Sequence, residues 1–220
     1  MAVQVKICGI NSVESADAAL RARVDFAGLM FHPKSPRALN AEQARMLSDR
    51  MKGRARLVAV VVDPDDAVLK TIIANAKPDF IQLHGRESVA RVSEIHSMTG
   101  LPVIKVVSVA EASDLAAASQ YESVADMLMF DAKAPASATR EGGHGAAFDW
   151  QLLRGRNFKR PWLLAGGLNA ENVAEAIGIT GAPGVDVSSG VESAPGVKDV
   201  SLIARFADAA RNAQYASSQA

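Results

Sequence analysis

Cys8, His84 and Asp131 each stand at the end of an apolar run, and each has a side chain that can move protons. A carboxyl group donates a proton, a thiolate accepts one and an imidazole does either near neutral pH, so these types suit general acid–base catalysis. Each also has a structural interpretation. A lone cysteine is most often a small buried hydrophobe, an aspartate after a strand caps a turn, and a histidine before a glycine hydrogen-bonds a loop. The fold must bring the three together for the catalytic interpretation to hold.

Two segments near the end of the chain have the composition of a phosphate site. Residues 163–169 read Leu-Leu-Ala-Gly-Gly-Leu-Asn, and residues 185–192 read Val-Asp-Val-Ser-Ser-Gly-Val-Glu. Both end an apolar run in small residues, whose backbone N–H groups approach a ligand closely, and a short helix near residues 189–194 would add its dipole. Tight turns are the alternative interpretation. The expected phosphate contacts are Gly166, Gly167, Ser188, Ser189 and Gly190.

The elements that position these residues follow from the alternation of β-branched runs with Ala-rich stretches, which is typical of parallel βαβ units. Three helix starts carry cap signals: Asn11 with Glu14, Asn40 with Gln43, and Asn169. A last helix is expected from about Val200 to Asn212. The eight expected strands are Val3–Cys8, Phe26–Phe31, Leu57–Asp63, Phe80–His84, Val103–Val107, Met127–Asp131, Trp162–Ala165 and Val185–Ser188.

Eight such units predict an α/β fold, a single-domain (β/α)8 TIM barrel; an open doubly wound sheet is the competing fold and leaves two or three runs unexplained. Barrel side chains alternate between the interior and the helix layer. Since Val5 and Ile7 belong to the apolar set, Lys6 and Cys8 are expected to face inward. The same alternation turns Gln82 with His84, Met129 with Asp131, and Asp186 with Ser188 inward, so polar side chains converge on one mouth.

Composition limits the class of protein. The chain has 220 residues, 49% of them hydrophobic, which suits one domain because single cores grow to about 250 to 300 residues. Lys plus Arg and Asp plus Glu both number 24, so no net field favours nucleic acid or an anionic membrane. One cysteine excludes an internal disulfide, and no secretory signal begins the chain, so we expect a cytoplasmic protein. The four histidines lack ligand spacing, and no metal is expected.

Two segments are irregular. The loop Lys133 to Ala147, which contains Gly142, Gly143 and Gly145, is expected to be a mobile lid after the sixth strand. The domain is expected over residues 1–213, with 214–220 as a polar C-terminal tail that frays. Outer barrel helices leave monomer and homodimer both open.

Six motifs in order are similar to those of a known family. They resemble phosphoribosylanthranilate isomerase, a family of the tryptophan pathway, from the first strand to the final helix. The motifs are Lys-Ile-Cys-Gly-Ile (6–10), Pro-Lys-Ser-Pro-Arg (33–37), Gln-Leu-His-Gly (82–85), Phe-Asp-Ala-Lys (130–133), Ala-Gly-Gly-Leu-Asn (165–169) and Val-Asp-Val-Ser-Ser-Gly-Val-Glu (185–192).

The resemblance implies a cofactor-free Amadori rearrangement of N-(5-phosphoribosyl)anthranilate to 1-(2-carboxyphenylamino)-1-deoxyribulose 5-phosphate. It implies Asp131 as general acid and Cys8 as general base. Arg37 would hold the anthranilate carboxylate, for which a guanidinium is suited; a surface arginine in a Pro-rich loop is the alternative. Gly143 would contact substrate from the sixth loop, where His144 replaces the small hydroxylic residue usual in the family's Gly-Gly-x-Gly.

The chemistry requires opposite shifts at the two catalytic groups. An acid near neutral pH must stay protonated, whereas a thiol base needs its pKa of about 8.5 lowered. We expect Lys6 to pair with Asp186 and to stabilise the Cys8 thiolate. Asp186 is also predicted to be a substrate-binding residue. A structural ion pair without effect on the thiol is the alternative.

Two other functions compete. One is the sister isomerase of histidine biosynthesis, which acts on ProFAR, or a bifunctional enzyme; Cys8 disfavours it, because those relatives use Asp at the first strand end. The other is a non-catalytic barrel that binds a sugar phosphate or a partner protein. Retention of Cys8 and Asp131 disfavours that function.

Overall fold

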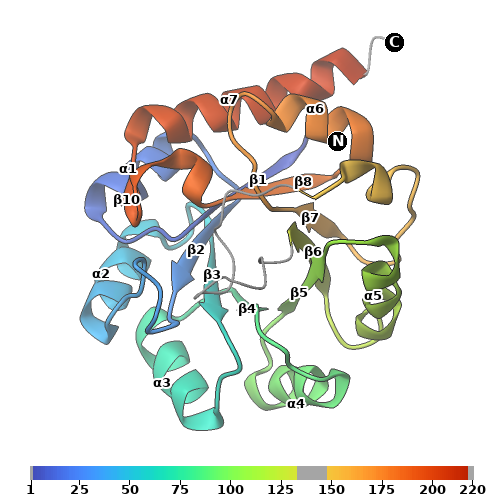
Figure 1. Ribbon diagram of the computed structural model, residues 1–220. Helices are drawn as coiled ribbons and strands as arrows, with labels where there is room; N and C mark the ends of the chain where they lie inside the picture. The colour runs from blue at the N-terminus through green and yellow to red at the C-terminus, as the bar shows by residue number, and fades with distance from the viewer. Residues whose placement is uncertain (1, 133–147, 218–220) are drawn as a thin grey trace.

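A closed barrel of eight parallel strands in chain order forms the centre of the protein (Figure 1). The computed structural model describes residues 2–132 and 148–217, the last four by backbone alone. All eight predicted runs are strands, so the (β/α)8 barrel is confirmed and the open sheet is wrong. The strands are β1 (Gln4–Cys8), β2 (Phe26–Met30), β3 (Arg56–Val61), β4 (Phe80–Leu83), β5 (Val103–Val109), β6 (Met127–Ala132), β7 (Trp162–Leu164) and β8 (Gly184–Val187).

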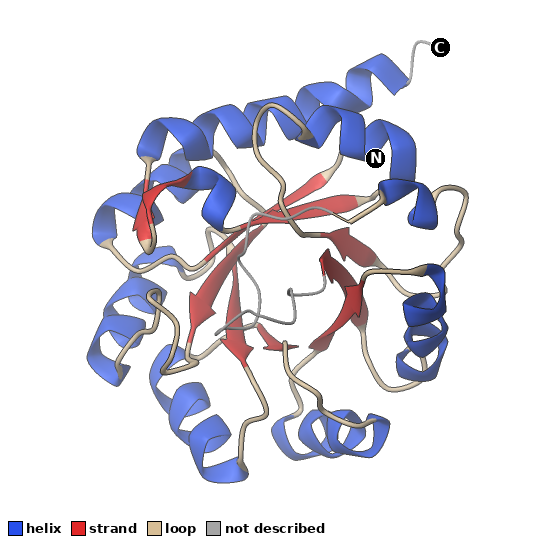
Figure 2. Ribbon diagram, viewed as in Figure 1, coloured by secondary structure: helices blue, strands red, loops and turns tan. Residues whose placement is uncertain are grey.

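Helices surround the barrel as an outer layer (Figure 2). Between β6 and β7 the described residues contain only the 3-10 helix η2 (Trp150–Leu153), where a regular alternation would place an α-helix. A second 3-10 helix, η1 (Ala112–Leu115), leads into the short helix that follows β5. The α-helices are α1 (Val13–Arg21), α2 (Ala41–Met51), α3 (Asp66–Ala76), α4 (Val89–Thr99), α5 (Ala116–Tyr121), α6 (Val173–Thr180) and α7 (Val200–Ser217).

The start of α1 differs from its prediction. Ser12, not Asn11, is the N-cap, and its hydroxyl accepts the backbone N–H of Ser15, whose own hydroxyl accepts the N–H of Ser12. Asn11 instead donates its side-chain amide to the carbonyl of Gly196. A serine pair closes the capping box as well as a Ser/Glu pair does, because each hydroxyl both donates and accepts.

The other two predicted helix starts had different outcomes. The box of Asn40 with Gln43 at α2 is confirmed. Asn169 does not begin a helix directly. Its side-chain oxygen Oδ1 accepts the backbone N–H groups of Glu171 and Asn172, and α6 starts at Val173, the residue after Asn172. An asparagine that bonds backbone two and three residues ahead makes a turn before the helix.

Two apolar layers make the core. Val5 and Ile7 of β1 and Phe130 of β6 pack between the strands and the helices. Cys8 and Met129 belong to a separate cluster inside the barrel. The predicted alternation along β1 and β6 is therefore confirmed.

The last helix is longer than predicted, since it was expected to end at about Asn212. Helix α7 continues to Ser217, so the boundary placed between residues 213 and 214 falls inside a helix. The sixth loop, Lys133 to Ala147, lies outside the described residues, and so do its glycines. Within the described part of the chain, no helix has the length and apolarity to cross a membrane.

We expect Ser12→Ala to lower the free energy of unfolding by about 1 kcal/mol, because the N–H of Ser15 loses its acceptor. Urea denaturation measures this change. The matched control is Glu14→Gln, at the exposed position that the sequence pattern favoured, with an expected change below about 0.5 kcal/mol. The reverse ranking would contradict the Ser12 cap.

Candidate active site

The barrel closes where β1 meets β8, and a buried ion pair lies at this closure. Lys6 is opposite Asp186 in the parallel register, and Lys6 Nζ donates to Asp186 Oδ1 at 2.8 Å. The Lys6 side chain is fully buried and that of Asp186 is 9% exposed. The predicted pairing of these two residues is confirmed.

Cys8 lies one layer above Lys6, at the carboxyl end of β1. A Cβ atom on Gly28 of the neighbouring β2 would lie 3.1 Å from both Cys8 Sγ and Lys6 Nζ. The thiol and the ammonium therefore share the space that a larger residue at Gly28 would fill.

Burial raises the pKa of the Cys8 thiol, and the positive charge of Lys6 opposes this rise without reversing it. The expectation of a lowered thiol pKa is wrong for the unliganded protein, because removal of the thiolate from water costs more than one paired cation returns. Burial also lowers the pKa of Lys6, but Asp186 and Cys8 outweigh it, so the Lys6 pKa is raised and the ammonium stays charged.

Asp131 contacts His84 across the mouth of the barrel. Asp131 Oδ2 lies 3.2 Å from His84 Nε2, and Asp131 Oδ1 accepts the N–H of Ala132 at 2.8 Å. On its other side, His84 Nδ1 lies 3.2 Å from Gln82 Nε2. The interpretation of His84 as a loop-bonding residue is wrong, because its ring joins the proposed acid to a buried amide. Gln82 Oε1 is buried and has no partner among the described residues.

The two glycine-rich strand ends meet each other and the acid. A Cβ atom on Gly166 would lie 2.6 Å from the backbone nitrogen of Ala132 and 3.1 Å from Asp131 Oδ1. A Cβ on Gly190 would overlap the carbonyl oxygen of Leu168. Gly166 and Gly167 have φ values of 88° and 65°, which favour glycine. Glycine is therefore required at these positions, because the two loops approach each other and β6 too closely to admit a side chain.

The helix expected near residues 189–194 is only partly present. A three-residue 3-10 helix, η3 (Ser189–Val191), leads into a hairpin of β9 (Glu192–Ala194) and β10 (Val197–Lys198). So short a helix has little dipole, so backbone N–H groups remain as the predicted phosphate donors. Ser188 is fastened to the first strand, since its hydroxyl donates to the carbonyl of Cys8 at 3.2 Å.

Arg37 is buried at the mouth, with 5% of its side chain exposed, so the surface-arginine alternative is wrong. Its Nε and Nη2 donate to the two carboxylate oxygens of Glu192 at 2.6 and 2.7 Å. Glu192 also accepts from Lys198 Nζ at 2.9 Å, and the same ammonium donates to the carbonyl of Ser188 at 2.9 Å. Gly9, with φ 78°, lets the Arg37 stem lie against the chain just after Cys8.

Sequence reasoning missed three of these residues. The sequence pattern predicts no role for Glu192, although this residue ends one of the six motifs, and none for Lys198 or Gly28. Nothing in the local sequence indicates that Lys198 is buried, since a lysine just after a Pro-Gly turn is expected to be exposed. Its side chain is nevertheless only 1% exposed. A glycine inside a strand does signal a close approach, and Gly28 was detectable by that rule.

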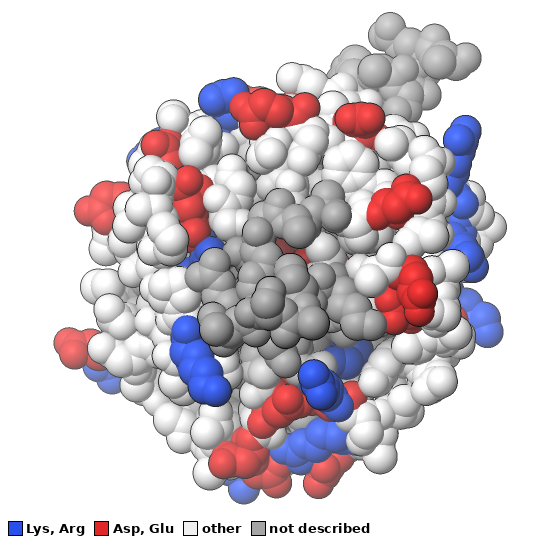
Figure 3. Space-filling model, in the orientation of Figure 1, with Lys and Arg blue, Asp and Glu red and all other residues white. Residues whose placement is uncertain are grey.

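On the face shown in Figure 3, acidic and basic side chains are interspersed around the rim and not gathered into one basic region. Among the described residues, no group of three His, Cys, Asp or Glu is placed to hold a metal ion.

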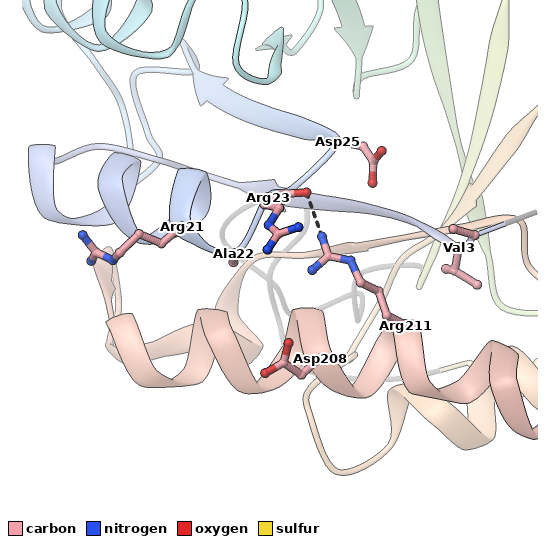
Figure 4. A pocket seen from close by; sticks show the side chains of 8 residues that line it. Val3, Arg21, Ala22, Arg23, Asp25, Asp208 and Arg211 are labelled. Carbon is pink, nitrogen blue, oxygen red and sulfur yellow. Dashed lines mark hydrogen bonds between the residues drawn. The ribbon is translucent and has the colours of Figure 1, made fainter.

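A separate cavity of about 470 Å³ lies at the amino-terminal end of β1, between the end of α1 and α7 (Figure 4). There Arg211 Nη2 donates to the carbonyl of Arg23 at 2.7 Å. Cations at a helix C-terminus stabilise the helix, which accounts for this contact. The cavity is at the opposite end of the barrel from Cys8 and Asp131.

The profile of the N-(5'-phosphoribosyl)anthranilate (PRA) isomerase family matches residues 5–209. The chain belongs to this family. It is therefore an isomerase, and the non-catalytic barrel is disfavoured. A relative named N-(5'-phosphoribosyl)anthranilate isomerase from Rhodopseudomonas palustris (strain BisB18) is 53% identical, over 97% of this chain and 98% of its own. The one from Bradyrhizobium sp. (strain ORS 278) is 50% identical over the full length of both.

Solved structures of PRA isomerases have the same fold. The crystal structure of the enzyme from Thermotoga maritima superimposes with a TM-score of 0.84 at 34% identity, covering 96% of this chain and 99% of that one. A structure of the enzyme in complex with reduced 1-(o-carboxyphenylamino)-1-deoxyribulose 5-phosphate has a TM-score of 0.82 at 33% identity, with the same coverage. Of the predicted site residues, Gly143 alone lies outside the described residues of this PRA isomerase family member.

The raised pKa of Cys8 makes stability depend on pH. The unfolded chain releases the thiol proton near a pKa of about 8.5, before the folded protein does, so the free energy of unfolding falls as pH rises above that value. The slope is at most about 1.4 kcal/mol per pH unit. The raised pKa of Lys6 acts only above its ordinary value of about 10.4. The lowered pKa of Lys198 acts in the opposite sense below about 10.4, so the contribution of Cys8 is the difference between two proteins. In urea denaturation between these limits, wild type should lose stability relative to Cys8→Ser as pH rises, and parallel profiles would contradict the prediction.

Replacement of Lys6 by methionine leaves the Asp186 carboxylate buried without its cation. We expect Lys6→Met to lose about 3–5 kcal/mol of stability and to raise the Cys8 pKa further. Urea denaturation gives the first change, and the thiolate absorbance of this single cysteine gives the second. Lys70→Met, at an exposed position of α3, is the control. An unchanged Cys8 pKa would leave Lys6 with a structural role alone.

Proposed function

We propose that this chain converts N-(5'-phosphoribosyl)anthranilate into 1-(2-carboxyphenylamino)-1-deoxyribulose 5-phosphate, the isomerase step of tryptophan biosynthesis, with Cys8 as general base and Asp131 as general acid. The observation that carries the proposal is that a thiol, a carboxyl contacted by His84 and two closely packed glycine-containing loops lie together at one barrel mouth. The family match and the product-analogue complex of a relative support the same substrate.

The phosphate is assigned to the loops after β7 and β8. Backbone N–H groups of Gly166, Gly167, Ser189 and Gly190 are the proposed donors, since oriented amides bind phosphate without a cation. Ser188, whose hydroxyl donates to the carbonyl of Cys8, positions the start of the second loop. Gly166 approaches Asp131, and Ser188 is bonded to Cys8, so a phosphate held there lies at the end of a sugar that reaches both catalytic groups.

The anthranilate carboxylate is assigned to Arg37. Glu192 occupies the Nε and Nη2 edge of the guanidinium, which fixes its plane. A carboxylate is left the edge formed by Nη1 and the second N–H of Nη2, where two parallel hydrogen bonds also form. Asp186 pairs with Lys6 in the layer of side chains below Cys8. From this position its negative charge is proposed to act on the substrate and on Cys8.

The proposed reaction assigns one proton donation to Asp131 and one proton removal to Cys8. Asp131 donates to the furanose ring oxygen as the C1–O bond breaks, which leaves an iminium between C1 and the anilino nitrogen. Cys8 then removes the C2 proton, and the electron pair of that C–H bond forms the C1=C2 double bond of an enolamine. Protonation at C1 and loss of the hydroxyl proton give the ketone, so C1 is reduced and C2 is oxidised without a cofactor.

The raised pKa of Cys8 is compatible with this order of steps. The thiol is mostly protonated in the unliganded protein, but an iminium cation beside it adds a positive charge to that of Lys6. The thiolate is then stabilised when the base is needed. His84, bonded to Asp131 Oδ2, orients the carboxyl toward the sugar.

The loss of substrate fluorescence in wild type, Cys8→Ser and Asp131→Asn tests the proposal. We expect turnover by wild type and a fall in kcat of about 10²- to 10⁴-fold in each variant, the usual contribution of a positioned proton-transfer group. Asp208→Asn, on the exposed face of α7, is the matched control and should retain the wild-type rate. A wild type without turnover would refute the function, and full activity of Cys8→Ser would refute the base.

A further inference from the structure

Arg37, Glu192 and Lys198 form a buried charged cluster, called here the mouth triad, whose last member has no part in the proposed chemistry. The side chains of Arg37, Glu192 and Lys198 are 5%, 4% and 1% exposed. Glu192 lies between the two cations and accepts hydrogen bonds from both. The two cations hold its pKa at about 2, so its carboxylate is ionised.

The mouth triad carries one positive charge in excess. Glu192 neutralises one of the two cations, and in the part of the chain that the structure describes neither cation has another ion-pair partner. The nearby Asp186 is paired with Lys6 and does not supply the missing charge. An uncompensated buried charge is costly, and an anionic ligand at the mouth relieves that cost.

Lys198 connects the two sides of the site. Its ammonium donates to the carbonyl of Ser188 at 2.9 Å and to the carboxylate that holds Arg37. Ser188 is bonded in turn to the carbonyl of Cys8. One buried ammonium therefore holds the proposed phosphate loop, the proposed carboxylate clamp and the end of β1 in a single hydrogen-bonded chain.

We propose that Lys198 is a positioning residue that supplies the excess positive charge of the mouth triad, and that it thereby favours both the anionic substrate and the thiolate of Cys8. The proposal rests on the proposed function for the identity of the substrate. The charged groups that face Cys8 are Lys6, Asp186, Arg37 and Lys198. Lys198 and Arg37, which lie at the mouth of the barrel, lower the pKa of Cys8. Burial lowers the pKa of Lys198 itself, and Glu192 opposes this shift.

The test compares variants that change the charge of the mouth triad in opposite directions. Lys198→Met makes the mouth triad neutral, and Glu192→Gln gives it two positive charges. Thiolate absorbance, with Cys8→Ser subtracted, should titrate at higher pH than wild type in Lys198→Met and at lower pH in Glu192→Gln. A role confined to packing would not shift the two titrations in opposite directions, so shifts of the same sign, or none, would overturn the proposal.

Inorganic phosphate provides a readout that needs no turnover. By calorimetry we expect Lys198→Met to bind phosphate about 10-fold or more weakly than wild type, because the positive charge beside the proposed phosphate loop and the hydrogen bond to Ser188 are both lost. Lys198→Arg should recover most of the affinity, and Lys70→Met should match wild type. Equal phosphate affinity in Lys198→Met and Lys70→Met would overturn the proposal.

The two proposals fail separately. Absence of turnover by wild type refutes the proposed function and leaves the phosphate and thiol measurements to decide on Lys198. If Lys198→Met lacks a cooperative thermal transition, Glu192→Gln decides by itself: a thiol titration at lower pH than wild type supports the proposal, and an unchanged or higher one overturns it.

Discussion

The ion pair of Lys6 with Asp186 is the constraint around which the site is arranged. It lies inside the barrel at the junction of β1 and β8, where the first and last strands close the sheet. A buried lysine keeps its charge only if a carboxylate faces it, so the pair requires this register and no other. In this register Cys8 lies at the mouth of the barrel with Ser188 beside it. The hydroxyl of Ser188 donates a hydrogen bond to the carbonyl of Cys8.

Opposing electrostatic effects meet at Cys8. Burial disfavours the thiolate, while Lys6, Lys198 and Arg37 favour it and Asp186 disfavours it. The result is a thiol pKa above its ordinary value, and any further charge beside Cys8 would change this balance. Such a balance is compatible with the proposed role of Cys8, in which it accepts a proton after a cationic intermediate has formed beside it.

Glycines make these close approaches sterically feasible. A side chain at Gly28 would displace the thiol or the ammonium, one at Gly166 would meet Asp131 and its neighbouring backbone, and one at Gly190 would separate the loops after β7 and β8. Each of these glycines has no side chain to pack against its neighbours, and this lets polar groups approach one another. The lost packing is recovered in the outer layer, where the apolar sides of the same strands meet the helices.

The sequence by itself determined the barrel, because eight strand segments alternate with helical segments along the chain. It also determined the inward direction of Cys8, Lys6, Asp131 and Asp186, because side chains alternate along a strand with a period of two residues. Local pattern did not reveal the partners. That His84 contacts Asp131, and that Glu192 holds both Arg37 and Lys198, depends on which loops lie side by side after closure. The sign of the Cys8 shift likewise depended on burial against charge, and only the tertiary structure decides how far water is excluded from the thiol.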